Sequence, residues 1–180
     1  MKERLRKYRN ILPTVKKNVY VDPDATVIGE VTLHEDVSIW PLVSVRGDVN
    51  RIEIGARSNI QDGTVIHVTR KSQSHPEGFP TIIGEDVTVG HKVMLHGCQL
   101  GHRILVGMGA IIMDDVTVED DVIIGAGALV PPGKTLEKGY LYIGSPAKKA
   151  RPLTKDELSF LKVSSDNYVR LKDEYLDGED

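Results

Sequence analysis

A six-residue repeat of aliphatic residues limits what this chain can fold into more than any other feature of its sequence. An α-helix would repeat its apolar residues every 3.6 positions and a simple β-strand every 2, so neither element explains a period of six. The repeat occurs at the following positions: Val21, Val27, Leu33, Ile39, Val45, then Ile54, Ile60, Ile66, then Ile83, Val89, Leu95, and finally Leu100, Val106, Ile112, Val118, Ile124, Val130 and Leu136 without a break.

A unit of six residues can hold one short strand and one corner. Three such units make a triangular coil, and successive coils would stack about 4.8 Å apart in hydrogen-bonding register, with the aliphatic residues inside. The repeat therefore predicts an all-β fold, a parallel β-helix of about six coils. A β-sandwich of short strands is the alternative, but a sandwich has no reason to keep one fixed period through seven consecutive units.

Breaks in the repeat divide the chain into three parts. Residues 1–18 precede it and are expected to cover one end of the column. The β-helix is expected over residues 19–150, with the polar segment 68–80 ejected as a loop because it holds two prolines and a glycine. Residues 151–180 are expected to form a helix and a tail, since Thr154 and Glu157 make a capping-box pattern at the start of a helix over 154–176.

Composition narrows the class of protein. The 180 residues carry a formal net charge of −3 and only 5% aromatic residues, which argues against a nucleic-acid partner. No apolar run approaches the roughly 18 residues of a membrane helix, so no membrane partner is expected. The single cysteine, Cys98, cannot form an internal disulfide, and the basic N-terminus lacks the apolar stretch of a signal peptide. A cytoplasmic protein is expected.

Three of the six histidines fall on neighbouring coils: His67, His91 and His96. A corner separates His91 from His96, so their side chains should point from adjacent faces and would not hold one metal within a single chain. Two columns side by side could share a metal, with His67 stacked near His96 as the third ligand. Three histidines with one open position are typical of catalytic zinc. Alternatively, they are outward polar positions that happen to be histidine.

Several motifs together resemble one family. The repeat, RGDVNRIEIGARSNIQDGTVIHV, the long loop, TIIGEDVTVGHKVMLHGC and YLYIGSPAK are similar to the gamma-class carbonic anhydrases, most closely to their short bacterial members of the YrdA type. The resemblance spans about residues 8–176 and implies a left-handed β-helix that forms a homotrimer. It also implies Zn²⁺ or Fe²⁺ at each subunit interface, bound by His67 and His96 of one subunit and by His91 of its neighbour.

The resemblance implies the reversible hydration of CO2 to bicarbonate by a metal-bound hydroxide. Gln61 and Asn59 match polar positions near the family's metal, where Gln61 could orient water or polarise CO2. Both could instead be corner residues that cap backbone groups. Tyr168 could reach the same pocket or belong to the apolar stripe of the last helix.

The RGD triplet places Arg46 and Asp48 at the family's subunit interface. The predicted contact joins Arg46 of one chain to a carboxylate of the next, with Asp62 as the candidate. Truncating one partner of such a desolvated pair is usually costly.

The chain lacks the residues that carry protons from the site to solvent in the family's archaeal prototype. The acidic insertion and its glutamate are missing, and Val49 follows Asp48 instead. Glu77 or His75 in the ejected loop could relay the proton. The alternatives left open are a metal-dependent thioesterase or esterase, a hexapeptide acyltransferase with one histidine as general base, and a non-catalytic metal-binding scaffold. Cys98 is either a small buried residue or a redox-sensitive neighbour of the site, and His102 lies behind the site or on the surface.

Overall fold

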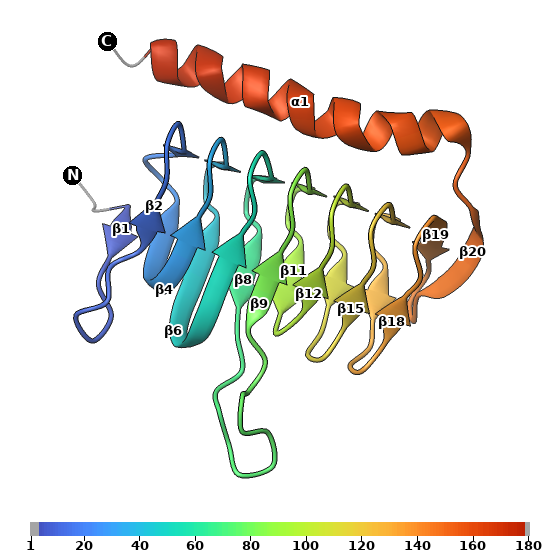
Figure 1. The fold of residues 1–180 in the computed structure, drawn as a ribbon, viewed down its shortest axis with the longest axis horizontal. Helices are drawn as coiled ribbons and strands as arrows, with labels where there is room; N and C mark the ends of the chain where they lie inside the picture. Colours follow the sequence, from blue (N-terminus) through green and yellow to red (C-terminus); the bar gives the residue numbers. More distant parts are fainter. Residues whose placement is uncertain (1–3, 179–180) are drawn as a thin grey trace.

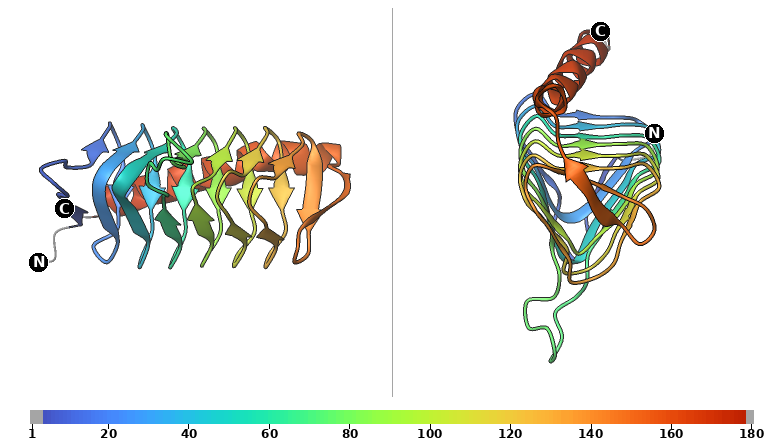
Figure 2. Two further views of the ribbon diagram at one scale, coloured as in Figure 1. Left: turned by 90° about the horizontal axis from the view of Figure 1, so that it is seen from below. Right: turned by 90° about the vertical axis from the view of Figure 1, so that its right-hand side faces the viewer.

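In the computed structural model, which describes residues 4–178, short parallel strands stack into a three-sided column (Figures 1 and 2). One long helix runs along the outside of the column. The predicted parallel β-helix with a C-terminal helix is confirmed. Residues 1–3 and 179–180, the outer ends of the predicted cap segment and tail, lie outside the described residues.

The column has three faces, seen end-on in the right-hand view of Figure 2. The β8 face comprises β8 (Val65–His67), β11 (Met94–His96), β14 (Ile111–Ile112) and β17 (Leu129–Val130). The β9 face comprises β9 (Thr81–Ile83), β12 (Gln99–Leu100), β15 (Thr117–Val118) and β18 (Thr135–Leu136). The helix-covered face comprises β3 (Tyr20–Val21), β5 (Ser38–Ile39), β7 (Asn59–Ile60), β10 (Thr88–Val89), β13 (Leu105–Val106), β16 (Ile123–Ile124) and β19 (Tyr140–Ile143), with β20 (Lys148–Pro152) antiparallel to β19.

Two long strands at the N-terminal end join the β8 and β9 faces. They are β4 (Thr26–Leu33) and β6 (Ser44–Ile54), and β6 pairs with β8 through its first residues and with β9 through its last. The register of the β4–β6 pair shifts between Gly29 and Val31, where β6 carries extra residues around Asp48. The short strands β1 (Leu5–Arg6) and β2 (Thr14–Val15) pair with β4 and extend this end.

The repeating aliphatic residues form the core. Each side chain of the longest run, Leu100 to Leu136, is at most 4% exposed. Burying a valine, leucine or isoleucine contributes about 1.5–3 kcal/mol. Because the repeat places one such residue on each face of each coil, the ladders of stacked aliphatic side chains supply a continuous core along the column.

Helix α1 (Lys155–Asp177) begins and ends one residue later than the predicted range. The capping box is present: the Glu157 amide donates to Thr154 Oγ1 at 3.1 Å, and the Thr154 amide donates to Glu157 Oε2 at 2.8 Å. The buried side of the helix contains Leu161, Ser164, Ser165 and Lys172, so it is largely polar.

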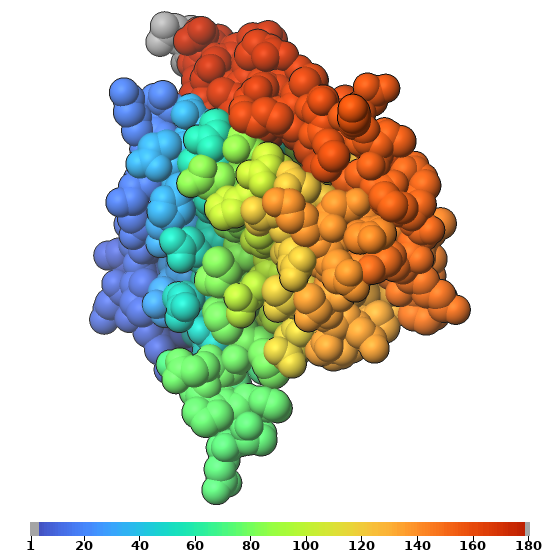
Figure 3. Space-filling view, turned by 45° about the vertical axis from the view of Figure 1, so that its right-hand side comes forward, coloured from blue at the N-terminus to red at the C-terminus, as the bar shows by residue number. Residues whose placement is uncertain are grey.

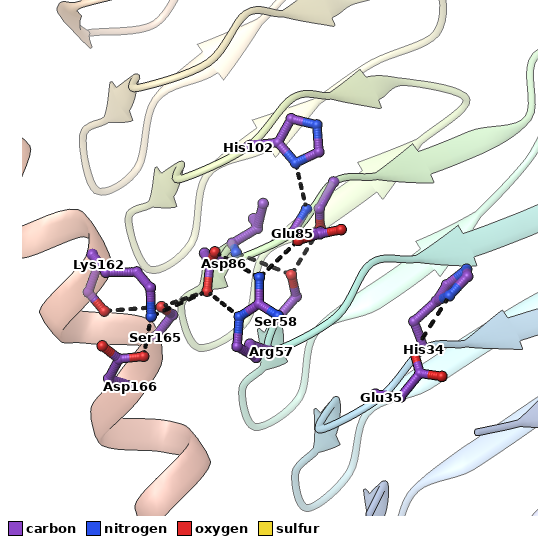
Figure 4. A network of polar contacts seen from close by, with 12 residues as sticks. His34, Glu35, Arg57, Ser58, Glu85, Asp86, His102, Lys162, Ser165 and Asp166 are labelled. Atoms are coloured by element: carbon purple, nitrogen blue, oxygen red, sulfur yellow. Dashed lines mark hydrogen bonds and ion pairs between the residues drawn. The ribbon is translucent and has the colours of Figure 1, made fainter. Parts of the chain in front are cut away.

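A polar network fastens α1 to the column (Figure 4). Asp86 accepts hydrogen bonds from Arg57 Nε at 2.8 Å and from Ser165 Oγ at 3.3 Å, and Lys162 Nζ lies 3.6 Å away. Burial raises the pKa of Asp86, but the hydrogen bonds and the two cations outweigh burial and hold that pKa below its usual value. An ionised Asp86 therefore joins the column to the helix.

The segment between β8 and β9 projects from one corner of the column (Figure 3). Its two arms are joined by an antiparallel bridge between Thr69 and Phe79. Asn50 Nδ2 donates to the carbonyl oxygens of Thr69 at 3.0 Å and Glu77 at 2.8 Å, which fixes the base of the loop to β6. Among the described residues, no helix has the length and apolar character needed to cross a membrane.

Candidate metal centre

His67 and His96 lie side by side where the loop leaves the column. They end the neighbouring strands β8 and β11 and are paired in register. Nδ1 of His67 and Nε2 of His96 are 3.1 Å apart. The repeat places them together because the loop removes the intervening residues from the coil, so that His67 and His96 occupy the same position in successive coils.

A carboxylate holds the other nitrogen of each ring. His67 Nε2 lies 3.0 Å from Asp48 Oδ1, and His96 Nδ1 lies 2.6 Å from Asp114 Oδ1. An ionised carboxylate only accepts hydrogen bonds, so these contacts place the N–H of each neutral imidazole on the carboxylate side. Two lone pairs then face each other, which requires a cation or a proton between them.

The pair fits a metal ion. At a Zn–N distance of about 2.1 Å and tetrahedral angles, two ligand nitrogens would lie about 3.4 Å apart, close to the observed spacing. Histidines that bind metals almost always donate their second N–H to a carboxylate, a carbonyl or a water. The donor set of two imidazoles, each backed by a carboxylate, therefore suits Zn²⁺ or Fe²⁺.

Asp48 is held in its ionised form. Burial raises the pKa of Asp48, but hydrogen bonds from His67 and Arg46 outweigh burial and hold that pKa below its usual value. Arg46 pairs with Asp48 of its own chain. The predicted contact between Arg46 and Asp62 of a neighbouring chain stays a prediction.

His91 lies at a different corner, between β10 and β11. Its Nδ1 is 3.0 Å from Asp62 Oδ2, and its side chain is 46% exposed. Within residues 4–178, no group of three or more histidine, cysteine, aspartate or glutamate side chains is placed to hold a metal. The chain thus brings together two of the three predicted ligands, and the third points outward from the opposite edge of the β8 face.

Exposed apolar side chains lie on the β8 face and at its edges. A hollow of about 230 Å³ beside His96 is lined by Met94, Ile111 and Met113, each of them more than a third exposed. Leu42 and Met108, at the corner turns near His91, are 69% and 60% exposed. An apolar surface of this kind next to a histidine pair is typical of a protein interface.

The other predicted catalytic residues lie near the His91 corner and under α1. Asn59 and Gln61 are buried; Gln61 Nε2 donates to Asn59 Oδ1 at 3.1 Å, and Asn59 Nδ2 donates to Thr88 Oγ1 at 3.0 Å. Tyr168 packs edge-on against Trp40, and burial followed by the charge of Asp62 raises its pKa. Within one chain, Asn59 and Gln61 are held by hydrogen bonds and Tyr168 is held by packing, and these contacts stabilise the fold.

The proposed proton relays lie in the projecting loop. Glu77 is 81% exposed and pairs with Lys71 at 3.0 Å, whereas His75 packs on Phe79 with 4.8 Å between ring centroids. Neither side chain has a hydrogen bond or ring contact with the histidine pair.

Cys98 lies in the core directly behind His96, and its thiol is hydrogen bonded to the His96 backbone, whereas His102 lies at another corner, between β12 (Gln99–Leu100) and β13 (Leu105–Val106). Complete burial raises the pKa of the Cys98 thiol to about 12, so it behaves as a small core residue with an inert thiol. His102 Nδ1 accepts a hydrogen bond from the Glu85 amide at 3.0 Å, in the region shown in Figure 4.

Sequence reasoning missed Asp114 and Thr69. Asp114 contacts His96 directly, and Thr69 Oγ1 donates to Asp114 Oδ2 at 2.9 Å. A signal was available: the repeat runs from Leu95 to Ile112 in a coil of 17 residues, which places Asp114 on Gly97, the residue after His96. Residues so spaced stack at the same corner.

Comparisons with known proteins bear on the fold and the family of the chain. A family model described as "Hexapeptide repeat of succinyl-transferase" matches residues 80–113. Protein YrdA of Escherichia coli (strain K12) is 59% identical over 177 residues, covering 98% of this chain and 96% of that protein. The mitochondrial gamma carbonic anhydrase 2 of Arabidopsis thaliana is 40% identical over 177 residues, covering 95% of this chain and 63% of that longer protein.

A solved structure is also similar. The crystal structure of a hexapeptide transferase family protein from Anaplasma phagocytophilum superposes with a TM-score of 0.90 at 38% identity, covering 97% of this chain and 99% of that one. The fold and these relatives lead to one assignment. The chain belongs to the family of hexapeptide-repeat proteins that are similar to gamma-class carbonic anhydrases.

Proposed function

We propose that this protein is a metal-dependent enzyme that hydrates CO2 reversibly to bicarbonate at the subunit interfaces of a homotrimer. The proposed ligands are His67 and His96 of one subunit and His91 of its neighbour. The metal is Zn²⁺ or Fe²⁺, with one ion at each interface. The relatives named as gamma carbonic anhydrases support this reaction.

One observation carries the proposal. His67 Nδ1 and His96 Nε2 face each other at 3.1 Å, while their other nitrogens contact Asp48 and Asp114. A bound Zn²⁺ or Fe²⁺ would supply Lewis acidity there, which lowers the pKa of water to roughly 7. The two carboxylates orient the rings and keep each lone pair directed at the shared space.

The β8 face supports assembly of the site from two chains. His91 lies at one edge of this face and the histidine pair at the other, with exposed Met94 and Ile111 between them. In a cyclic trimer, each His91 edge would meet the histidine pair of the next subunit. Asp62 would orient His91 as Asp48 and Asp114 orient the other two rings.

Acyl transfer is the competing reaction, since relatives of this fold include transferases. A general base needs one histidine with a free lone pair. Two rings with facing lone pairs serve a cation better than they serve proton abstraction, so the geometry favours the metalloenzyme.

The test is metal analysis of protein purified without oxygen, followed by CO2 hydration and acyl-CoA hydrolysis assays on the same sample. The wild type should carry about one Zn or Fe per chain and accelerate CO2 hydration. His91→Ala should lose the metal, whereas the control His102→Ala should keep it, because the His102 ring is hydrogen bonded to the Glu85 amide at another corner of the column. Unchanged metal content in His91→Ala would contradict the ligand assignment. If the protein hydrolyses acyl-CoA but does not hydrate CO2, the proposed reaction is wrong and the substrate is a thioester.

A further inference from the structure

We propose that Asp114 is a positioning residue for the metal ligand His96, and that Thr69 locks Asp114 to the base of the projecting loop. This inference rests on the proposed function, because it concerns the orientation of a metal ligand. It assigns a role to two residues that lie outside the ligand set.

Both oxygens of the Asp114 carboxylate are engaged. Oδ1 lies 2.6 Å from His96 Nδ1, and Oδ2 accepts a hydrogen bond from Thr69 Oγ1 at 2.9 Å. Asp114 follows β14, His96 ends β11, and Thr69 begins the loop, so the contact joins two coils of the column to the loop. With both oxygens held, the carboxylate cannot rotate away from the imidazole.

The backbone beside this carboxylate is shaped to admit it. Gly97 has φ of +58°, and a Cβ atom built on it would lie 2.2 Å from Asp114 Oδ1. Only glycine leaves room for the carboxylate at this corner. The Gly97 amide donates to Thr81 Oγ1 at 3.0 Å, and the Thr81 hydroxyl donates to the carbonyl of His67 at 2.7 Å, which fixes the corner to the other histidine.

The chemical consequence is the choice of tautomer. A carboxylate on Nδ1 holds the proton there, so the lone pair of His96 is on Nε2 and faces His67. Without the charged acceptor, the ring can place its proton on Nε2 or turn, and either change removes a ligand. Thr69 acts through Asp114, because its hydroxyl orients the carboxylate.

Metal affinity tests the inference directly. We expect Asp114→Asn to weaken Co²⁺ or Zn²⁺ binding by about 10–100-fold in a chelator competition. The d–d absorption of the Co²⁺-loaded protein should change as well. Asp115→Asn is the matched control, since Asp115 is the next residue, is exposed, and is not hydrogen bonded through its side chain to the histidine pair. Thr69→Val should cause a smaller loss, and Thr69→Ser should restore wild-type affinity because it keeps the hydroxyl.

A second measurement uses the metal-free protein. The nitrogen-15 shifts of the imidazoles should report the proton of His96 on Nδ1 in the wild type and in Asp115→Asn, and a mixture in Asp114→Asn. Circular dichroism and thermal melts show whether each variant is folded. If a folded Asp114→Asn binds metal within twofold of Asp115→Asn with the same Co²⁺ spectrum, the inference is wrong while the proposed function stands. If the wild type binds no metal but shows this tautomer difference, the proposed function fails and the positioning role of Asp114 remains.

Discussion

At the scale of single residues, the site depends on backbone that only glycine can supply. Gly97→Ala would place a methyl group 2.2 Å from Asp114 Oδ1 in a left-handed backbone conformation. The conformation alone costs about 1–2 kcal/mol for a non-glycine residue. We expect a larger loss of unfolding free energy in urea denaturation, together with weaker metal binding, because the carboxylate must move away from His96.

Gly109→Ala is the control for this variant. Gly109 has φ of +69° and no heavy atom within 4 Å of a built Cβ, so it carries the backbone cost without the clash. Equal losses of stability and equal metal affinities in the two variants would contradict the role given to Gly97.

Some residues of the proposed site could be predicted from the sequence, and others could not. His67, His91 and His96 stand out by their spacing and by motif. Asp114 does not, because an acidic residue at a corner of this fold is ordinary: Asp36, Asp86, Asp115 and Asp121 all occupy corners with positive φ. What distinguishes Asp114 is its approach to His96, which depends on the exact stacking of two coils.

At the scale of elements, helix α1 is held by charge as well as by packing. Asp86→Asn removes the ionised acceptor of Arg57 and Ser165. Because hydrogen bonds to charged groups contribute about 1.5–3 kcal/mol, we expect a loss of about 2 kcal/mol of unfolding free energy at pH 7. Asp166→Asn, at a partly exposed position on the same helix that pairs with Lys162, should lose about 0.5 kcal/mol or less.

The Asp86 contribution has a defined pH dependence. Its pKa in the folded protein lies below the unfolded value of about 3.9, so the contribution is present in full above that value and is lost as pH falls through the folded pKa. The difference in urea stability between wild type and Asp86→Asn should therefore narrow below about pH 4. A gap that stays constant down to pH 2 would show that Asp86 acts through shape and not through charge.

The helix also shows what a pattern can predict within one element. Thr154 and Glu157 predicted its start to within one residue, because a capping box is a local arrangement. The apolar stripe expected from the sequence comprises Leu158, Leu161, Tyr168, Leu171 and Tyr175. It is wrong in part: Leu161 is buried and both tyrosines pack on Trp40, but Leu158 and Leu171 are more than a third exposed. The helix also buries Ser164, Ser165 and Lys172, because part of the face beneath it is polar: Ser164 contacts Thr88 at 3.0 Å, and Lys172 pairs with Asp36 at 3.1 Å.

At the scale of the whole molecule, the six-residue repeat determines the column because every coil meets the same neighbours above and below. The repeat does not determine the proposed metal site, since His91 and the histidine pair lie at different corners of one chain. Completing the proposed site would require contact between columns, and stacking within a column carries no information about such a contact. The exposed apolar residues of the β8 face are the feature of the single chain that supports the proposed contact.

Ile111→Lys tests the assembly. Ile111 is exposed in the single chain and lines the apolar hollow beside His96, so a lysine there would be an unpaired charge in the proposed interface. Burying an unpaired charge in an interface costs several kcal/mol. Light scattering after size exclusion should therefore show that the trimer dissociates into smaller species. Metal should be lost in parallel, because His91 no longer reaches the neighbouring pair.

Thr117→Lys places the same charge at an exposed position of the β9 face and should leave mass and metal unchanged. A trimeric, metal-loaded Ile111→Lys would put the interface elsewhere, and a metal-loaded wild-type monomer would mean that one chain completes the site alone.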